Sequence, residues 1–171
     1  MNLNCPLCNS TATLFCEKPR HLFYKCNTCE GIFRPKHTFL TAKEEKEHYE
    51  KHNNDVFDER YQAFVSPIVD AILQDFSTEA KGLDFGSGTG PVIAKMLTDK
   101  GFQVQNYDLF FANEVSLLKE KYNYVSCCEV MEHFYQPYKE FELLKSLLLP
   151  KGKLYCKTAV YNNQKPFENW Y

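Results

Sequence analysis

The chain has 171 residues, of which 44% are hydrophobic and 15% aromatic, and its charged side chains nearly cancel to a formal charge of −2. This composition excludes a disordered chain, and the charge argues against strong electrostatic attraction of the whole protein to nucleic acid. The N-terminus lacks the basic and apolar segments of a signal peptide, and no apolar run approaches the roughly 20 residues of a membrane helix. We therefore expect a cytoplasmic protein with no membrane association.

Four of the eight cysteines form two C-x-x-C pairs near the N-terminus. Two residues between the cysteines let a tight turn direct both thiolates at one ion, and two such turns complete a four-thiolate site. The pattern resembles a zinc ribbon, and the β-prone stretches around Lys18, Pro19 and Arg20 are typical of its hairpin. At this spacing we favour structural zinc over an iron–sulfur cluster. The expected zinc ligands are Cys5, Cys8, Cys26 and Cys29.

The zinc-ribbon-like module is expected to cover residues 1–40. Its local excess of basic and aromatic side chains allows a role in RNA contact. We favour the alternative that the aromatic residues form the small core of the module and its contact with the next domain. A closed four-thiolate site offers no open coordination position, so no catalysis is expected there. The aromatic residues concerned are Phe15, Phe23, Tyr24 and Phe33.

Residues 41–78 are expected to form a helical connector. Thr41 and Glu44 have the spacing of a capping box, which predicts the start of a helix. A second helix should follow, because apolar side chains recur at helical spacing. His48 and His52 lie one turn apart, and we favour a solvated helix face over a metal site for them.

Strand and helix patterns alternate over residues 79–171. Such alternation predicts an α/β domain with a doubly wound, mostly parallel sheet and helices on both faces. The expected strands cover 81–88, 102–110 and 152–160, and a further strand begins at residue 122 and runs into EVMEHF, residues 129–134. The expected helices cover 91–101, 113–122 and 138–150.

The stretch GLDFGSGTG, residues 82–90, ends the first expected strand. Its glycines permit positive φ angles and a close approach of a ligand to the backbone. Ligands of parallel sheets bind at the carboxyl ends of the strands. Asp108 follows at about the 20-residue spacing expected of a nucleotide-binding fingerprint. Pro91 stands where a dinucleotide-binding G-x-G-x-x-G pattern needs its third glycine, which disfavours a dinucleotide.

Four segments in order resemble the class I S-adenosylmethionine-dependent methyltransferases: GLDFGSGTG, Asp108, VSCCEVMEHF and LLLPKGKLYCKT. The resemblance implies a Rossmann-like fold that binds S-adenosylmethionine. Asp84 would order the loop or approach the methionine amino group, and Asp108 would hold the ribose hydroxyls. Residues after the third strand, including Val130, would line the face where the methyl group is transferred. The implied cofactor-binding residues are Asp84, Gly86, Ser87, Gly88, Gly90, Asp108, Cys128 and Glu129.

The implied catalytic residues are Glu129, Glu132 and His133, which form an E-x-x-E-H cluster. Similar methyltransferases that modify RNA 3′ ends bind a divalent ion with such a cluster and a further histidine. No histidine follows His133 in this sequence, so we favour an acid–base or orienting role near the acceptor over a metal site.

The sequence departs from the family pattern in two places. The segment between the second and third strands has room for one helix only, so one edge strand of the sheet is expected to be absent. The chain also stops soon after the fourth strand, before the usual C-terminal antiparallel pair. Either the chain is truncated, or a homodimer or another partner covers this edge. The activity of a chain of this length is therefore open.

The favoured function is S-adenosylmethionine-dependent methyl transfer to a small-molecule acceptor. One alternative is an RNA methyltransferase that uses the ribbon to contact RNA. The other is an interaction protein that binds S-adenosylmethionine but has little or no catalytic activity.

Overall fold

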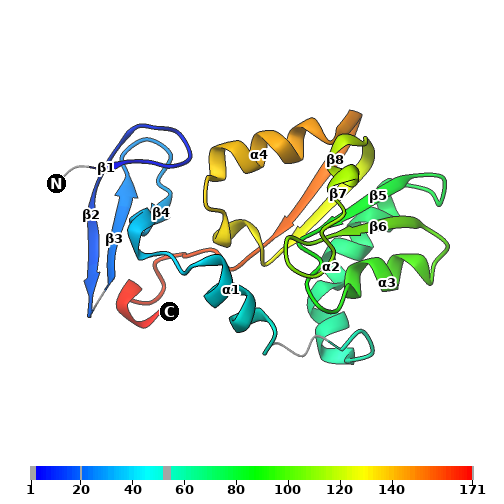
Figure 1. The fold of residues 1–171 in the computed structure, drawn as a ribbon, viewed down its shortest axis with the longest axis horizontal. Coiled ribbons are helices and arrows are strands. Elements are labelled where there is room, and N and C mark those ends of the chain that lie inside the picture. The colour runs from blue at the N-terminus through cyan, green and yellow to red at the C-terminus, as the bar shows by residue number, and fades with distance from the viewer. Residues whose placement is uncertain (1–2, 20, 52–54, 171) are drawn as a thin grey trace.

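The computed structural model describes residues 3–19, 21–51 and 55–170, which form two separate sheets (Figure 1). The N-terminal sheet is antiparallel, with strand order β1-β2-β3-β4. The second sheet is parallel, with strand order β6-β5-β7-β8. The expected α/β architecture behind a small N-terminal β module is therefore confirmed at this level.

The N-terminal sheet, which we call the ribbon, is built on one long hairpin. Lys18 pairs with His21 at its end, where the sequence predicts the turn. Few of its side chains are buried, so its apolar core is small. Its strands are β1 (Leu3–Asn4), β2 (Thr11–Lys18), β3 (His21–Cys26) and β4 (Ile32–Phe33).

Two helices follow the ribbon, α1 (Ala42–Tyr49) and α2 (Glu59–Asp75). The predicted capping box is present, because Glu44 N–H donates to Thr41 Oγ1 and Thr41 N–H donates to Glu44 Oε2. No residue of α1 is buried, whereas α2 buries one apolar face against the parallel sheet. His52 lies outside the described residues. Within the described part of the chain, no helix combines the length and apolarity needed to cross a bilayer.

The parallel sheet has helices on both faces. Apolar residues of α2 and α3 pack on one face around Tyr124, and Leu144 of α4 packs on the other face beside Val125. Neighbouring residues of β7 thus point into different cores, as the alternation of side chains along a strand requires. The elements are β5 (Lys81–Phe85), α3 (Val92–Thr98), β6 (Gln103–Tyr107), β7 (Tyr122–Cys128), α4 (Pro137–Ser146) and β8 (Leu148–Lys157).

The helix predicted over residues 113–122 is absent, and a 3₁₀ turn, Val115–Lys119, takes its place. Residues 108–112 are used in a tight turn closed by paired backbone hydrogen bonds between Asp108 and Ala112. The Tyr122 hydroxyl then donates to the Leu117 carbonyl, which satisfies a turn carbonyl that a longer helix would use itself. The residues between this turn and β7 therefore form only the 3₁₀ turn.

Residues 161–170 leave the parallel sheet and pack against the ribbon (Figure 1). The Phe167 ring lies 5.2 Å from the Phe15 ring and 4.9 Å from the Phe23 ring, and it is 6% exposed. Cys16 Sγ donates to Glu168 Oε1 at 3.6 Å. Two of the ribbon's aromatic residues thus provide a packing surface, in agreement with the favoured interpretation of the sequence.

Replacing Phe167 by alanine should loosen the ribbon and residues 161–170 together. The substitution removes a buried ring that contacts both segments, and such changes cost about 3–5 kcal/mol in a core. Hydrogen exchange of β2 and β3 should accelerate, while exchange of β5 and β7 should change little. Phe57→Ala is the matched control, because Phe57 is 70% exposed. Equal acceleration in both variants would contradict the assigned contact.

Candidate functional site

The loop between β5 and α3 is held tightly in place. Gly86 and Gly88 have φ angles of 75° and 64°, in the region that favours glycine. The Gly86 and Ser87 N–H groups both donate to the Tyr107 carbonyl at the end of β6, at 2.7 and 3.2 Å. A Cβ atom on Gly86 would lie 2.4 Å from Val130 Cγ2. Glycine is therefore required at position 86 by both its φ angle and its neighbour.

Asp108 links the end of β6 to this loop. Its Oδ2 accepts the Gly88 N–H at 2.9 Å, and its Oδ1 accepts the Phe110 and Phe111 N–H groups at 2.8 and 3.1 Å. The side chain is buried, so these charge-assisted bonds are little screened by water. The glycine loop and Asp108 are thus adjacent in space, as the sequence predicts.

Asp84 lies in the interior below the loop and is 4% exposed. Burial raises the pKa of its carboxyl to about 6, against the opposing effect of hydrogen bonds from Ser126 and from the backbone of Ala94. Ser126 Oγ donates to Asp84 Oδ1 at 2.7 Å. Asp84 also lines a cavity of about 20 Å³ together with Tyr61 and Cys128, which is room for about one water molecule.

Glu129 follows β7 in a left-handed conformation, with a φ angle of 53°. Such a conformation is costly for a residue with a side chain, and it often occurs at functional sites. The Glu129 N–H donates to the Lys157 carbonyl at 2.7 Å, which fixes the backbone here. Burial and the nearby Glu132 carboxylate raise the pKa of Glu129, while the positive charge of Lys157 lowers it. Glu129 is also hydrogen-bonded to Glu132, which raises its pKa further.

Tyr49, at the end of α1, lies over this end of the sheet. Its ring centroid is 5.6 Å from that of His133 and 6.4 Å from that of Phe110. Burial and the carboxylates of Glu45, Glu132 and Asp108 raise the pKa of the Tyr49 hydroxyl. Tyr49 and Tyr61 were not predicted as site residues, because a helical pattern does not reveal which side chain reaches the sheet.

The structure brings most of the predicted cofactor residues to one edge. Asp84, the loop that contains Gly86 and Gly90, Asp108 and Cys128 lie at the carboxyl ends of β5, β6 and β7 or directly after them. Ligands of parallel sheets bind at this edge. Glu132 and His133 belong to a short 3₁₀ turn beyond it and are exposed. Glu129, Glu132 and His133 do not converge on a common point in the way that the four N-terminal cysteines do.

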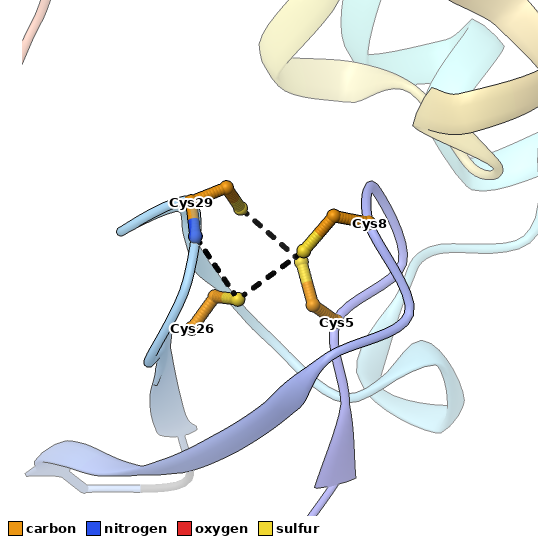
Figure 2. A group of neighbouring side chains, drawn as sticks. All are labelled: Cys5, Cys8, Cys26 and Cys29. Carbon is orange, nitrogen blue, oxygen red and sulfur yellow. Dashed lines mark hydrogen bonds between the residues drawn. The ribbon is translucent and has the colours of Figure 1, made fainter.

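The four cysteines of the ribbon form a cluster (Figure 2). All four Sγ atoms lie within 4.8 Å of one another, with 3.6 Å between Cys5 and Cys29 and 3.4 Å between Cys8 and Cys26. The Thr28 and Cys29 N–H groups donate to Cys26 Sγ, as is favourable for a thiolate. Four sulfurs around a zinc ion at about 2.3 Å would lie about 3.8 Å apart, so the donor set fits a tetrahedral metal ion.

Comparison with known protein families gives a match. A family model described as a methyltransferase domain matches residues 57–171, which include α2 and the whole parallel sheet. The ribbon and α1 lie outside the matched region. No curated protein matches the chain.

Replacing Asp84 by asparagine should stabilise the ligand-free protein at neutral pH. The folded-state pKa of about 6 exceeds the ordinary value of 3.8, so the wild-type protein loses stability as the pH rises through this interval. Asparagine still accepts the Ser126 hydrogen bond and carries no charge. Urea unfolding should show an advantage of about 1–3 kcal/mol above pH 6 that shrinks towards pH 4.

Asp75→Asn is a control of opposite sign. Hydrogen bonds from Lys153 and Tyr155 lower the pKa of Asp75, so its carboxylate stabilises the protein at neutral pH and this contribution fades as the pH falls. A loss of stability in Asp84→Asn that is the same at pH 4 and pH 8 would show that the Asp84 charge is not the source of the effect.

Proposed function

Because the chain belongs to the methyltransferase-domain family, we propose that it binds S-adenosylmethionine and transfers the methyl group to a small-molecule acceptor. The observation that carries this proposal is the loop of Gly86 and Gly88, joined to β6 by the Asp108 carboxylate. It presents bare backbone and a buried acidic group at the edge where parallel sheets bind nucleotide-like ligands.

The residues present fit this cofactor. Gly86 allows the loop its positive φ angle and its close packing on Val130, which together set the shape of the loop that would meet the cofactor. A carboxylate has about four acceptor positions, of which the three backbone N–H groups at Asp108 use three, so one position is left for a ribose hydroxyl. Asp84, held by Ser126, would ionise on meeting the cationic amino group of the methionine part.

When bound, the cofactor supplies a methyl group on a sulfonium, whose in-line transfer depends mainly on the position of the acceptor atom. We assign Glu129, Glu132 and His133 to the acceptor side. The raised pKa of Glu129 suits a group that takes a proton from the acceptor. His133 is steadied by its edge-to-face contact with Tyr49 and would orient the acceptor.

We also propose the finer assignments of architecture. The order β6-β5-β7-β8 fits a Rossmann-like sheet in which the chain returns from β6 to β7 without an intervening strand. We propose that the ribbon binds structural zinc through its four thiolates. RNA methylation has less support, because Phe15 and Phe23 contact Phe167 and are used in packing.

Calorimetry with S-adenosylhomocysteine tests cofactor binding. Gly86→Ala and Asp108→Asn should each weaken binding by about tenfold or more. The first substitution introduces a clash with Val130, and the second weakens the hydrogen bonds that hold the loop. Asp99→Asn is the control, since Asp99 pairs with Lys95 on the surface of α3. A wild-type protein that gives no binding heat would defeat the proposal. Binding without transfer to any acceptor would instead favour a role in interaction.

Metal analysis tests the ribbon assignment. The purified protein should hold about one zinc ion per chain, as a single four-thiolate site requires. Cys8→Ser should lose the zinc and unfold the ribbon, because metal binding supplies much of the folding free energy of such a module. Cys16→Ser should keep it, since Cys16 lies outside the cluster. Iron with visible absorbance in place of zinc would contradict the assignment.

A further inference from the structure

A cleft of about 1810 Å³ lies between the ribbon and the methyltransferase domain. Ribbon residues around Cys8 and Phe33 line one side, and residues 131–139 line the other. Tyr49, Glu132 and His133 also line it, so it opens onto the residues assigned to the acceptor side. We call this space the module cleft.

The module cleft is larger than a small reacting group requires. Pockets for small molecules usually measure about 300–1,000 Å³. It therefore has room for the body of an acceptor whose reactive atom lies near His133. Ribbon residues form one side of this space, so an acceptor bound there would contact the ribbon.

Apolar and aromatic side chains face the cleft from both sides. Leu7 and Leu22 of the ribbon line it and are each 37% exposed. Tyr138 lines the opposite side and is 59% exposed, and Phe39 and Tyr135 meet between the two sides with ring centroids 5.4 Å apart. An exposed ring such as that of Tyr138 can bind a planar aromatic group by stacking.

Lysine and arginine side chains outnumber carboxylates in the lining of the cleft. Arg34 and Lys36 on the ribbon side and Lys139 on the other side line it, and they form no ion pair with any residue in the ranges that the structure describes. One of the three acidic residues that line the cleft is in an ion pair, and the other two form hydrogen bonds with uncharged or acidic groups. Glu30 pairs with Lys25, Glu45 accepts the Tyr135 hydroxyl, and Glu132 is hydrogen-bonded to Glu129.

We propose that the module cleft holds the methyl acceptor and that this acceptor is a planar aromatic molecule with an anionic group. The inference rests on the proposed function and adds the chemical class of the acceptor. The ring would stack on Tyr138 and its neighbours, and the anion would lie between Arg34 and Lys139. A long RNA is disfavoured, because the chain has a net charge of −2 and RNA binding needs an extended basic surface.

Two fluorescent probes that differ by one anionic group test this class. 8-Anilinonaphthalene-1-sulfonate and the uncharged N-phenyl-1-naphthylamine should both bind the folded protein, the sulfonate more tightly. Trp170 is the single tryptophan of the chain and lines the cleft, so energy transfer from it reports where a probe binds. Uridine monophosphate and 4-hydroxybenzoate are tested as competitors. They distinguish a nucleotide, whose anion is a phosphate, from an aromatic carboxylate.

The double variant Arg34→Gln/Lys139→Gln should weaken sulfonate binding about fivefold to tenfold, as expected for the loss of two charge interactions in contact with solvent, and leave the uncharged probe unchanged. Tyr138→Ala should weaken both probes. Lys100→Gln/Lys119→Gln makes the same change in net charge outside the cleft and should bind both probes like the wild type.

Equal affinity of the sulfonate for the two double variants, or no energy transfer from Trp170, would overturn the proposal. Displacement by neither competitor, or tight binding of an RNA oligonucleotide that weakens steeply with salt, would also overturn it. S-adenosylhomocysteine should bind the Arg34→Gln/Lys139→Gln variant like the wild type. Probe binding without S-adenosylhomocysteine binding would refute the proposed function and leave an anion-binding cleft.

Discussion

The carboxylate of Asp108 is the interaction on which the site depends. It accepts three backbone N–H groups, one from the glycine loop and two from the turn that follows β6. Buried N–H groups without a partner are costly, so this one side chain lets two irregular segments meet in the interior. The neighbouring Tyr107 carbonyl accepts the Gly86 and Ser87 N–H groups, so the whole loop is shaped by the end of β6. Phe85 pairs with Tyr107 in the parallel register of β5 and β6, so the glycine loop and the turn after β6 begin at the same level of the sheet.

The ribbon and the parallel sheet are stabilised in different ways. The sheet has apolar cores on both faces, whereas the ribbon has only a few buried side chains besides its cysteines. A module with so small a core needs another source of stability, such as a metal site. Phe167 provides a second source, because its ring fills the space between Phe15 and Phe23. The ribbon is thus held to the rest of the chain by aromatic contacts as well as by its connection to α1.

Local sequence rules predicted the parts of the structure that depend on local constraints. The Gly86 and Gly88 φ angles, the capping box at Thr41 and the clustering of the four cysteines follow from spacing alone. The helix predicted over 113–122 was wrong, because Val115–Lys119 form a 3₁₀ turn and the Leu117 carbonyl accepts the Tyr122 hydroxyl. Tyr49 and the module cleft depend on contacts between distant segments, for which a single sequence carries no signal. The contributions of individual site residues to binding remain predictions from the resemblance.

The contact between residues 161–170 and the ribbon joins positions that are 152 residues apart, as between Cys16 and Glu168. The hairpin of β2 and β3 is made early during synthesis, long before its aromatic partner exists. Phe15 and Phe23 therefore stay uncovered on the growing chain until residues 161–170 leave the ribosome. If the four thiolates bind a metal ion as proposed, its early capture would hold the hairpin in shape over that interval.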